Sequence, residues 1–361
     1  MGKLHKAIKK GELEIVYMLL DGRADANECD EEGLSALHMA AIKGHSEITR
    51  LLLKRRADVN SRSVTGWTPL HRSVWEGNTG IAKLLLEWGA DVNAGEDNHG
   101  ITPLWMGMAL NRTEMVELLL EWGADTSIGG EDEGIPLLHV AIGESNLAAV
   151  EMLLDRGVNV NTEAEEGWTP LHEAILERNF DIAQLLLKRG ARVDACTTDD
   201  VLGWTPLHLA THMGEAGIAN LLLDWKADPD ARDKDGRTPL HLAAEEDDSV
   251  MVPVLVGRGA DPDSRNHTGE TPLYLASWHN KLRVAEALLD NGARVNSGND
   301  EKWTPLHQAA INGRMEFAGL LLQRGADPNS RNADGWTPLH MASLRGYPEL
   351  VTMLMASGGT G

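Results

Sequence analysis

The chain of 361 residues has few cysteines, little positive charge and no long apolar run. Two cysteines, far apart in the sequence, fit a reducing intracellular compartment, either the cytoplasm or the nucleus. Its 33 Lys and Arg against 55 Asp and Glu give a net charge of -22. Nucleic-acid binding rests largely on cations that neutralise phosphates, so that role is not expected. Without a run of about 18 apolar residues, no membrane span is expected either.

The first ten residues are basic and contain no apolar segment of the kind that forms the centre of a signal peptide, so none is expected. Phenylalanine and tyrosine are scarce as well. The chain holds two Phe and three Tyr against eleven Trp. The tryptophans therefore carry most of the aromatic surface that could contact a partner.

One four-residue phrase recurs along the whole chain. Thr68 to His71 reads Thr-Pro-Leu-His, and strict or looser copies follow at steps of 33 to 36 residues. Stepping back 33 residues from His38 reaches His5, which gives eleven copies. A fixed period in this range indicates a solenoid of stacked repeats. The last position of the phrase falls at residues 38, 71, 105, 139, 172, 208, 241, 274, 307 and 340.

Each copy also has a second half. The leucines 84–86 are followed by Trp88 and by Gly-Ala-Asp-Val-Asn at 89–93, and similar strings end the other copies. Thr68 is suited to cap a helix, Pro69 to its first position, and Gly89 to the left-handed residue after a second helix. In wording and order the repeat resembles the ankyrin repeat family over essentially all 361 residues.

That resemblance implies an all-α solenoid of stacked helix-turn-helix units with projecting β-hairpin-like turns. One repeat domain over residues 1–361 is expected, its end copies acting as caps. A disulfide between Cys29 and Cys196 is implausible across about five stacked copies. The expected copies are 1–29, 30–62, 63–96, 97–130, 131–163, 164–199, 200–232, 233–265, 266–298, 299–331 and 332–356, followed by a flexible tail at 357–361.

Three places depart from the regular repeat. Pro136 and its neighbours scramble the phrase, so copy five should lack its threonine cap. The step from His172 to His208 is 36 residues, and the extra residues fall within 196–202. In copy eight, Glu and Asp at 245–248 replace the glycine turn and Pro253 follows early in the second helix. We expect copy eight to be locally irregular and less stable than its neighbours.

The sequence offers no catalytic constellation, so we expect no enzyme activity, no metal site and no cofactor. The family resemblance gives the recurring histidine a structural role, bonding to threonine and backbone and tying adjacent copies together. Neighbouring copies should lie near 10 Å apart, too far for a shared metal. Nine histidines occupy this position: His5, His38, His71, His139, His172, His208, His241, His307 and His340.

Ten of the eleven tryptophans fall into three classes by position in the repeat, and Trp105 replaces the histidine of its copy. One class stands four residues before the phrase's last position, in the finger-like turn. A second stands four residues after it, near the end of the first helix. The third ends the second helix, where other copies carry Arg, and is read as structural. The finger class is Trp67, Trp168, Trp204, Trp303 and Trp336; the second is Trp75 and Trp278; the third is Trp88, Trp122 and Trp225.

In the ankyrin family, finger turns and first-helix ends line a concave groove that contacts partners. The first two classes are therefore expected to lie in that groove. Trp75 and Trp278 are the better contact candidates, and the finger class is better explained by packing on neighbouring turns. Trp is strongly enriched at binding hot spots.

Acidic residues share these positions. Carboxylates beside Trp rings suit a Lys- or Arg-rich segment through charge-assisted bonds and cation-π contact. The candidate acids at first-helix ends are Glu76, Glu144, Glu177, Glu245 and Glu246; those in the fingers are Glu165, Glu166 and Glu270, together with Glu31, Glu32, Asp132, Glu133, Asp300 and Glu301.

The sequence thus predicts non-enzymatic recognition of a protein or peptide, with positive charge on that partner. A monomer is the expected state. Two alternatives stay open. One is a ligand-sensing or regulatory repeat region of a larger multidomain protein, such as an immune-type receptor or an enzyme. The other is small-molecule binding by stacking on groove tryptophans.

Overall fold

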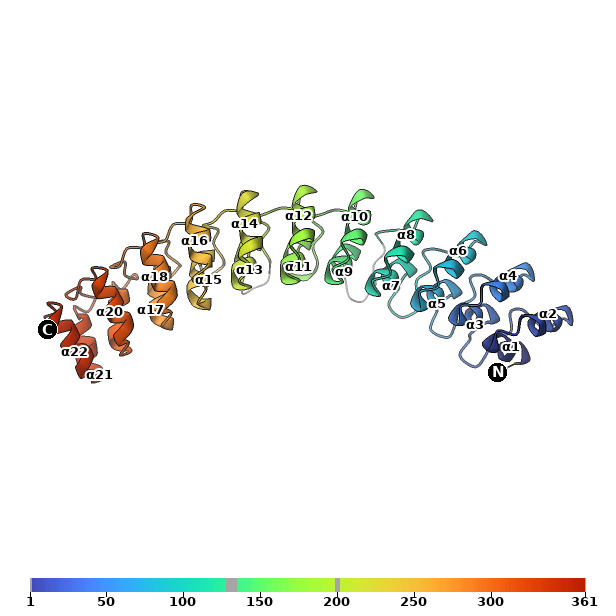
Figure 1. Ribbon diagram of the computed structural model, residues 1–361, viewed down its shortest axis with the longest axis horizontal. Helices are drawn as coiled ribbons and strands as arrows, with labels where there is room; N and C mark the ends of the chain where they lie inside the picture. The colour runs from blue at the N-terminus through green and yellow to red at the C-terminus, as the bar shows by residue number, and fades with distance from the viewer. Residues whose placement is uncertain (1, 128–134, 199–201, 361) are drawn as a thin grey trace. The chain divides into compact units, whose positions relative to one another are not determined.

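The structure is a computed structural model that describes residues 2–127, 135–198 and 202–360. These residues form 22 α-helices and one short 3-10 helix, Glu165–Gly167, with a single antiparallel bridge between Cys29 and Ser35 and no strand. The all-α fold expected from the repeat is confirmed. The chain divides into two compact units, residues 1–165 and 166–361. Figure 1 labels the helices of both.

In both units an odd-numbered helix is the first of a pair and the next even-numbered helix is the second. Unit 1 contains α1 (Lys3–Lys10), α2 (Leu13–Asp21), α3 (Ala36–Lys43), α4 (Ser46–Lys54), α5 (Pro69–Glu76), α6 (Thr79–Glu87), α7 (Pro103–Ala109), α8 (Thr113–Glu121), α9 (Leu137–Gly143) and α10 (Leu147–Asp155). Unit 2 contains α11 (Pro170–Leu176), α12 (Phe180–Lys188), α13 (Pro206–His212), α14 (Ala216–Asp224), α15 (Pro239–Glu246), α16 (Met251–Val256), α17 (Pro272–His279), α18 (Leu282–Asp290), α19 (Pro305–Ile311), α20 (Met315–Gln323), α21 (Pro338–Arg345) and α22 (Pro348–Ala356).

The repeated phrase starts each first helix as its chemistry requires. In α5, Thr68 caps the helix by accepting the backbone N–H of His71, and Pro69 takes the first helical position. The predicted left-handed residue after the second helix is confirmed at Gly89, with φ 86°. The predicted loss of the cap in copy five is confirmed too, because Pro136 stands at the N-cap of α9 and gives no side-chain bond.

The core of each unit lies between successive helix pairs. Small residues on the first helices, such as Ala40 and Ala243, are fully buried and allow close stacking, as in α3 against α5 and α15 against α17. The second helices contribute larger side chains, such as Leu85 and Leu222, which are also fully buried. A single pair could not cover these apolar surfaces, so each pair depends on its neighbours.

The projecting turns, here called the fingers, are the expected β-hairpin-like elements. In one finger the Ser63 N–H donates to the Trp67 carbonyl at 2.9 Å, closing the hairpin. The next residue, Val64, donates its N–H to the carbonyl of Glu32 in the preceding finger at 3.1 Å. The same bond recurs in unit 2, where His267 N–H donates to the Asp235 carbonyl at 3.0 Å. Backbone bonds therefore connect successive fingers within each unit.

The repeated histidines carry a second connection between copies. The imidazole Nε2 of His71 lies 2.9 Å from the carbonyl of Ile101 in the next finger, and its Nδ1 lies 3.1 Å from the Thr68 backbone nitrogen. A carbonyl only accepts, so Nε2 donates and the neutral ring accepts the Thr68 N–H at Nδ1. The structural role expected for this histidine is confirmed. His38, His208, His241 and His307 make the same pair of contacts.

Copy eight is irregular, as predicted. Its second helix, α16, has six residues where the other second helices have nine, and Pro253 lies within it. Asp247 takes the left-handed turn position with φ 66°, which glycine holds in copies such as the second and third, at Gly44 and Gly77. Its lower stability stays a prediction. Of the insertion predicted within residues 196–202, residues 199–201 lie outside the described part of the chain.

The end of the chain is bonded to the turn before it. Asn329 donates from its side chain to the Gly358 carbonyl at 2.9 Å and accepts the Thr360 N–H at 2.8 Å. One copy earlier, the side chain of Asn296 accepts the Asp327 N–H at 2.9 Å, just as Asn329 accepts the Thr360 N–H. The flexibility expected from sequence for residues 357–361 stays a prediction. None of the described helices is long and apolar enough to reach across a bilayer.

Candidate functional site

The sequence-predicted site residues fall on one surface in each unit. We call it the finger face: the fingers together with the C-terminal ends of the first helices. Its clearest feature is a pocket of about 620 Å³ in unit 2. Fingers contribute Glu270, Asp300, Glu301 and Trp303 to the walls, and the end of α17 contributes Trp278. Three of the predicted residues, Glu270, Trp278 and Trp303, are thus brought together in one cavity.

The repeat extends this geometry to the other predicted residues. Glu166 occupies the same position in its copy as Glu301, and Glu177 the same position as Asn312, which also lines the pocket. Both side chains are exposed. In unit 2 the equivalent positions are held by Trp168, Glu177, Trp204, Glu245, Glu246 and Trp336; in unit 1 they are held by Trp67, Trp75, Glu76, Glu144 and Glu165. Asp132 and Glu133 lie outside the described residues.

The floor of the pocket is a buried polar network. Gln308, on α19, donates its side-chain amide to the phenol oxygen of Tyr274 at 2.5 Å, and Gln308 is 4% exposed. Burial raises the pKa of Tyr274 to about 12, and the negative charges of Glu270 and Glu301 act in the same direction. Tyr274 therefore stays a neutral phenol.

This floor was not predicted from sequence. Tyr274 stands where most copies have the bonded histidine, and the sequence showed only that the histidine was missing. Gln308 occupies the position after the histidine, which varies among apolar, charged and amide residues. The available signal was that a chain with three tyrosines places one of them at this slot.

The finger tryptophans pack on their own copies. The ring of Trp168 lies 5.2 Å from that of His172, and its indole N–H donates to Glu173 at 2.8 Å. Trp204 lies 4.9 Å from His212 in the same way. These contacts lie within one copy, whereas packing on the neighbouring turn was expected from sequence. Trp75 and Trp278, by contrast, are 49% and 51% exposed and offer large open ring surface.

Several predicted acids already have internal partners. Arg237, in the finger of copy eight, contacts Glu245 at 3.3 Å and the buried carboxylate of Asp233 at 2.9 Å. The carboxylate of Glu246 lies 2.9 Å from Nδ1 of His212. Burial raises the pKa of Glu245, while Arg237 opposes that rise. These two acids are therefore weaker candidates for contact with an external cation than Glu270 or Glu301.

One arginine of the chain itself, Arg72, packs against a tryptophan of the finger face. The guanidinium of Arg72, on α5, lies 4.4 Å from the centre of the Trp67 ring, and the Trp67 and Trp75 rings lie 5.5 Å apart. Glu32 and Glu76 act on Arg72 electrostatically and counter the loss of solvent that lowers its pKa. A tryptophan pair with nearby carboxylates thus accommodates a guanidinium in unit 1. The sequence analysis did not single out Arg72.

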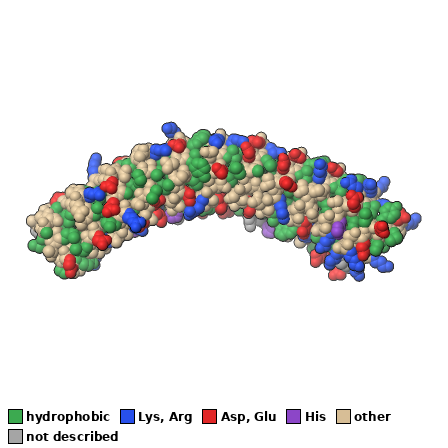
Figure 2. Space-filling view, viewed as in Figure 1, with side chains coloured by type: hydrophobic (Ala, Val, Ile, Leu, Met, Phe, Trp, Pro, Cys, Tyr) green, Lys and Arg blue, Asp and Glu red, His purple; other side chains and the backbone are tan. Residues whose placement is uncertain are grey.

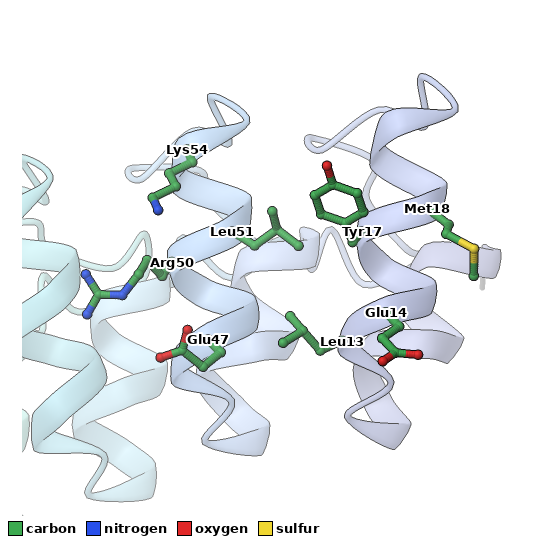
Figure 3. Close-up of a pocket in the computed structure, with 8 residues that line it drawn as sticks. All are labelled: Leu13, Glu14, Tyr17, Met18, Glu47, Arg50, Leu51 and Lys54. Carbon is green, nitrogen blue, oxygen red and sulfur yellow. The ribbon is translucent and has the colours of Figure 1, made fainter.

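The second helices form a different surface. In unit 1, a pocket of about 440 Å³ lies between α2 and α4. Figure 3 shows Leu13 and Tyr17 projecting from α2 toward Leu51 on α4, while Met18 points to the other side of α2. The Arg55 guanidinium lies 5.2 Å from the Tyr17 ring. This apolar patch was also absent from the sequence-based prediction.

Positive charge gathers near the N-terminus. Residues 1–62 hold eleven Lys and Arg and ten Asp and Glu, so the entire net negative charge of the chain comes from the residues after them. Figure 2 shows the Lys and Arg side chains concentrated over the N-terminal helices. The electrostatic attraction for a positively charged partner is therefore stronger at the later copies than at the first two.

Among the described residues, no group of three His, Cys, Asp or Glu side chains is placed to hold a metal ion. Cys29 and Cys196 are both exposed free thiols. The arrangement offers binding surface, aromatic rings and carboxylates.

Comparison with known proteins agrees with the geometry. The family model for ankyrin repeats in three copies matches residues 4–96, 105–197, 138–233, 192–266, 225–299 and 273–360. No curated protein matches the chain. The matches cover far more than half of the sequence, and the helix pairs follow the repeat throughout the described residues. The chain belongs to the ankyrin repeat family.

Proposed function

We propose that this protein binds a basic segment of a partner protein or peptide through its finger face and catalyses no reaction. Ankyrin repeats are generally protein-protein interaction modules and are typically not enzymes. The finer part of the proposal, a basic partner at this face, is supported by the pocket between copies nine and ten. There Trp278 and Trp303 stand beside Glu270, Asp300 and Glu301.

The charge distribution supports the same partner. Exposed carboxylates at Glu166 and Glu177 continue the acidic character of the face in copy six. Carboxylates at equivalent positions of successive copies suit an extended segment that carries several cations. Such a segment gains from charge-assisted bonds and from attraction at a distance, both of which weaken as salt is added.

Charge reversal tests the proposal. The double variant Glu166→Lys and Glu177→Lys should weaken binding of a fluorescent octa-arginine peptide by roughly fivefold to tenfold at low salt, because two attractions become repulsions. The matched control reverses Glu286 and Glu316, which are exposed on the second helices α18 and α20. Fluorescence anisotropy on the full chain gives the affinities, with octa-glutamate as the negative peptide.

Equal weakening by both double variants would show that net charge alone, and not the finger face, governs binding. Failure of octa-arginine to bind the unmodified chain would refute the basic partner altogether. A small planar ligand that quenches tryptophan fluorescence while octa-arginine does not bind would favour small-molecule recognition instead.

A further inference from the structure

We infer that the pocket between copies nine and ten binds the side chain of one arginine of the partner segment, with the guanidinium held between the tryptophans and the acids. This inference rests on the proposed function and names the chemistry at its centre. The walls are Trp278 from α17 and, from the two fingers, Glu270, Asp300, Glu301 and Trp303.

The first support is the precedent within the chain. In unit 1 the finger tryptophan Trp67 lies against the guanidinium of Arg72, and the ring of Trp75 in the same copy lies 5.5 Å from that of Trp67. Arg72 comes directly after the histidine of its copy. In copy ten that position holds Gln308, a neutral side chain that bonds to Tyr274 at the pocket floor. The finger tryptophan of copy three thus recurs in copy ten as Trp303, a second tryptophan, Trp278, comes from copy nine, and the cation of the chain itself is replaced by an amide.

The charges around the pocket give the second support. Asp300 is paired with Arg265 at 2.8 Å, and Arg345 also lines the pocket. Glu270 accepts bonds from Asn266 and Thr268 at 2.9 Å and 2.8 Å, which fix its carboxylate in place. Against Arg265 and Arg345 stand three carboxylates, so the lining keeps an excess of negative charge. A single added cation would balance it.

The shape favours guanidinium over ammonium. A guanidinium is planar, stacks on an indole face and presents several donors at once, whereas an ammonium is a compact and strongly hydrated charge. About 620 Å³ is in the range of pockets that enclose small ligands, so there is room for the arginine and the backbone on either side of it. The exposed ring of Trp278, 51% open, would become covered on binding.

A set of three blocked pentapeptides tests the inference: Gly-Ser-Arg-Gly-Ser, the same peptide with citrulline, and the same with lysine. Citrulline keeps the shape of arginine and removes its charge. Binding to the full chain is followed by the indole N–H signals in NMR, with the signal of Trp278 assigned by its loss in Trp278→Leu. Trp225→Leu is the matched control, because Trp225 is similarly exposed but ends the second helix α14.

The arginine peptide should shift the indole signals of Trp278 and Trp303 saturably. Citrulline should bind roughly tenfold more weakly, since the bonds to charged groups are lost, and lysine several-fold more weakly. Trp278→Leu should weaken arginine binding roughly fivefold, and Trp225→Leu should leave it unchanged.

Equal binding of citrulline, or equal effects of the two Trp variants, would overturn the arginine pocket. If octa-arginine still binds in that case, the proposed function stands and only the pocket fails. If octa-arginine does not bind either, both fail.

Discussion

Between pH 7 and pH 5 the protein should lose about 2 kcal/mol of unfolding free energy for each of three buried histidines, His38, His71 and His241. Burial lowers the pKa of each from 6.5 to about 4, although the bond to a carbonyl in the next finger opposes this. The bonding pattern requires the same result. Protonation would place a second N–H at Nδ1, facing the threonine N–H that it now accepts.

The sign follows from the direction of these shifts. A histidine whose folded pKa is lowered binds its proton more readily in the unfolded chain. The stabilisation is therefore complete above the unfolded pKa near 6.5 and is lost as the pH falls from there toward 4. Burial lowers the pKa of His208 and His307 in the same direction. Both units should lose stability in acid.

Thermal unfolding followed by circular dichroism at pH 7, 6 and 5 would measure this loss. His71→Gln is the control: it should lower stability at pH 7, yet reduce the pH dependence by up to about 1.4 kcal/mol per pH unit, the effect of one proton. A melting temperature that stays constant from pH 7 to pH 5 would contradict the conclusion that these histidines are neutral in the folded chain. An unchanged dependence of stability on pH in His71→Gln would contradict it as well.

Phe317→Ala should destabilise unit 2 by about 3 to 5 kcal/mol. The chain has two phenylalanines, and they form a natural pair for comparison. Phe317, on α20, is 1% exposed and lies in the core between helix pairs, whereas Phe180, on α12, is 42% exposed. Both occur on second helices of the same unit.

Phe180→Ala should therefore cost less than about 1 kcal/mol. Urea unfolding of both variants, with the slope compared to that of the unmodified chain, would separate a loss of stability from a change in the unfolding transition. Similar costs for the two substitutions would contradict the buried position of Phe317 and the packing of α20 on its neighbours.

The repeat phrase made most of the fold predictable because each residue in it has a local task. Thr68 caps, Pro69 starts the helix, and His71 reaches a carbonyl one copy ahead, so the period fixes the stacking. The missing cap at Pro136 and the irregularity of copy eight followed from the same rules. The bonds of Thr360 were not foreseen, because a short Ser-Gly-Gly-Thr ending gives no sign of the asparagine that bonds it.

The sequence predicted which repeat positions form the site, but not which side chains contact one another there. Sequence placed Glu270, Trp278 and Trp303 on one surface, since their repeat positions share a face. It could not show that Arg237 engages Glu245 or that Tyr274 and Gln308 form a pocket floor. The Tyr274–Gln308 contact joins side chains from different copies, whose pairing the repeat period does not specify, and the Arg237–Glu245 contact needs two residues that no other copy has at these positions.

Hydrogen-deuterium exchange of the full chain, with and without octa-arginine, tests the central claim most directly. The account predicts that the peptide slows exchange in the fingers and first-helix ends of unit 2, above all at residues 268–279 and 299–312, and leaves α18 and α20 unchanged. Protection confined to the second helices, or none at a peptide concentration that saturates binding, would contradict it.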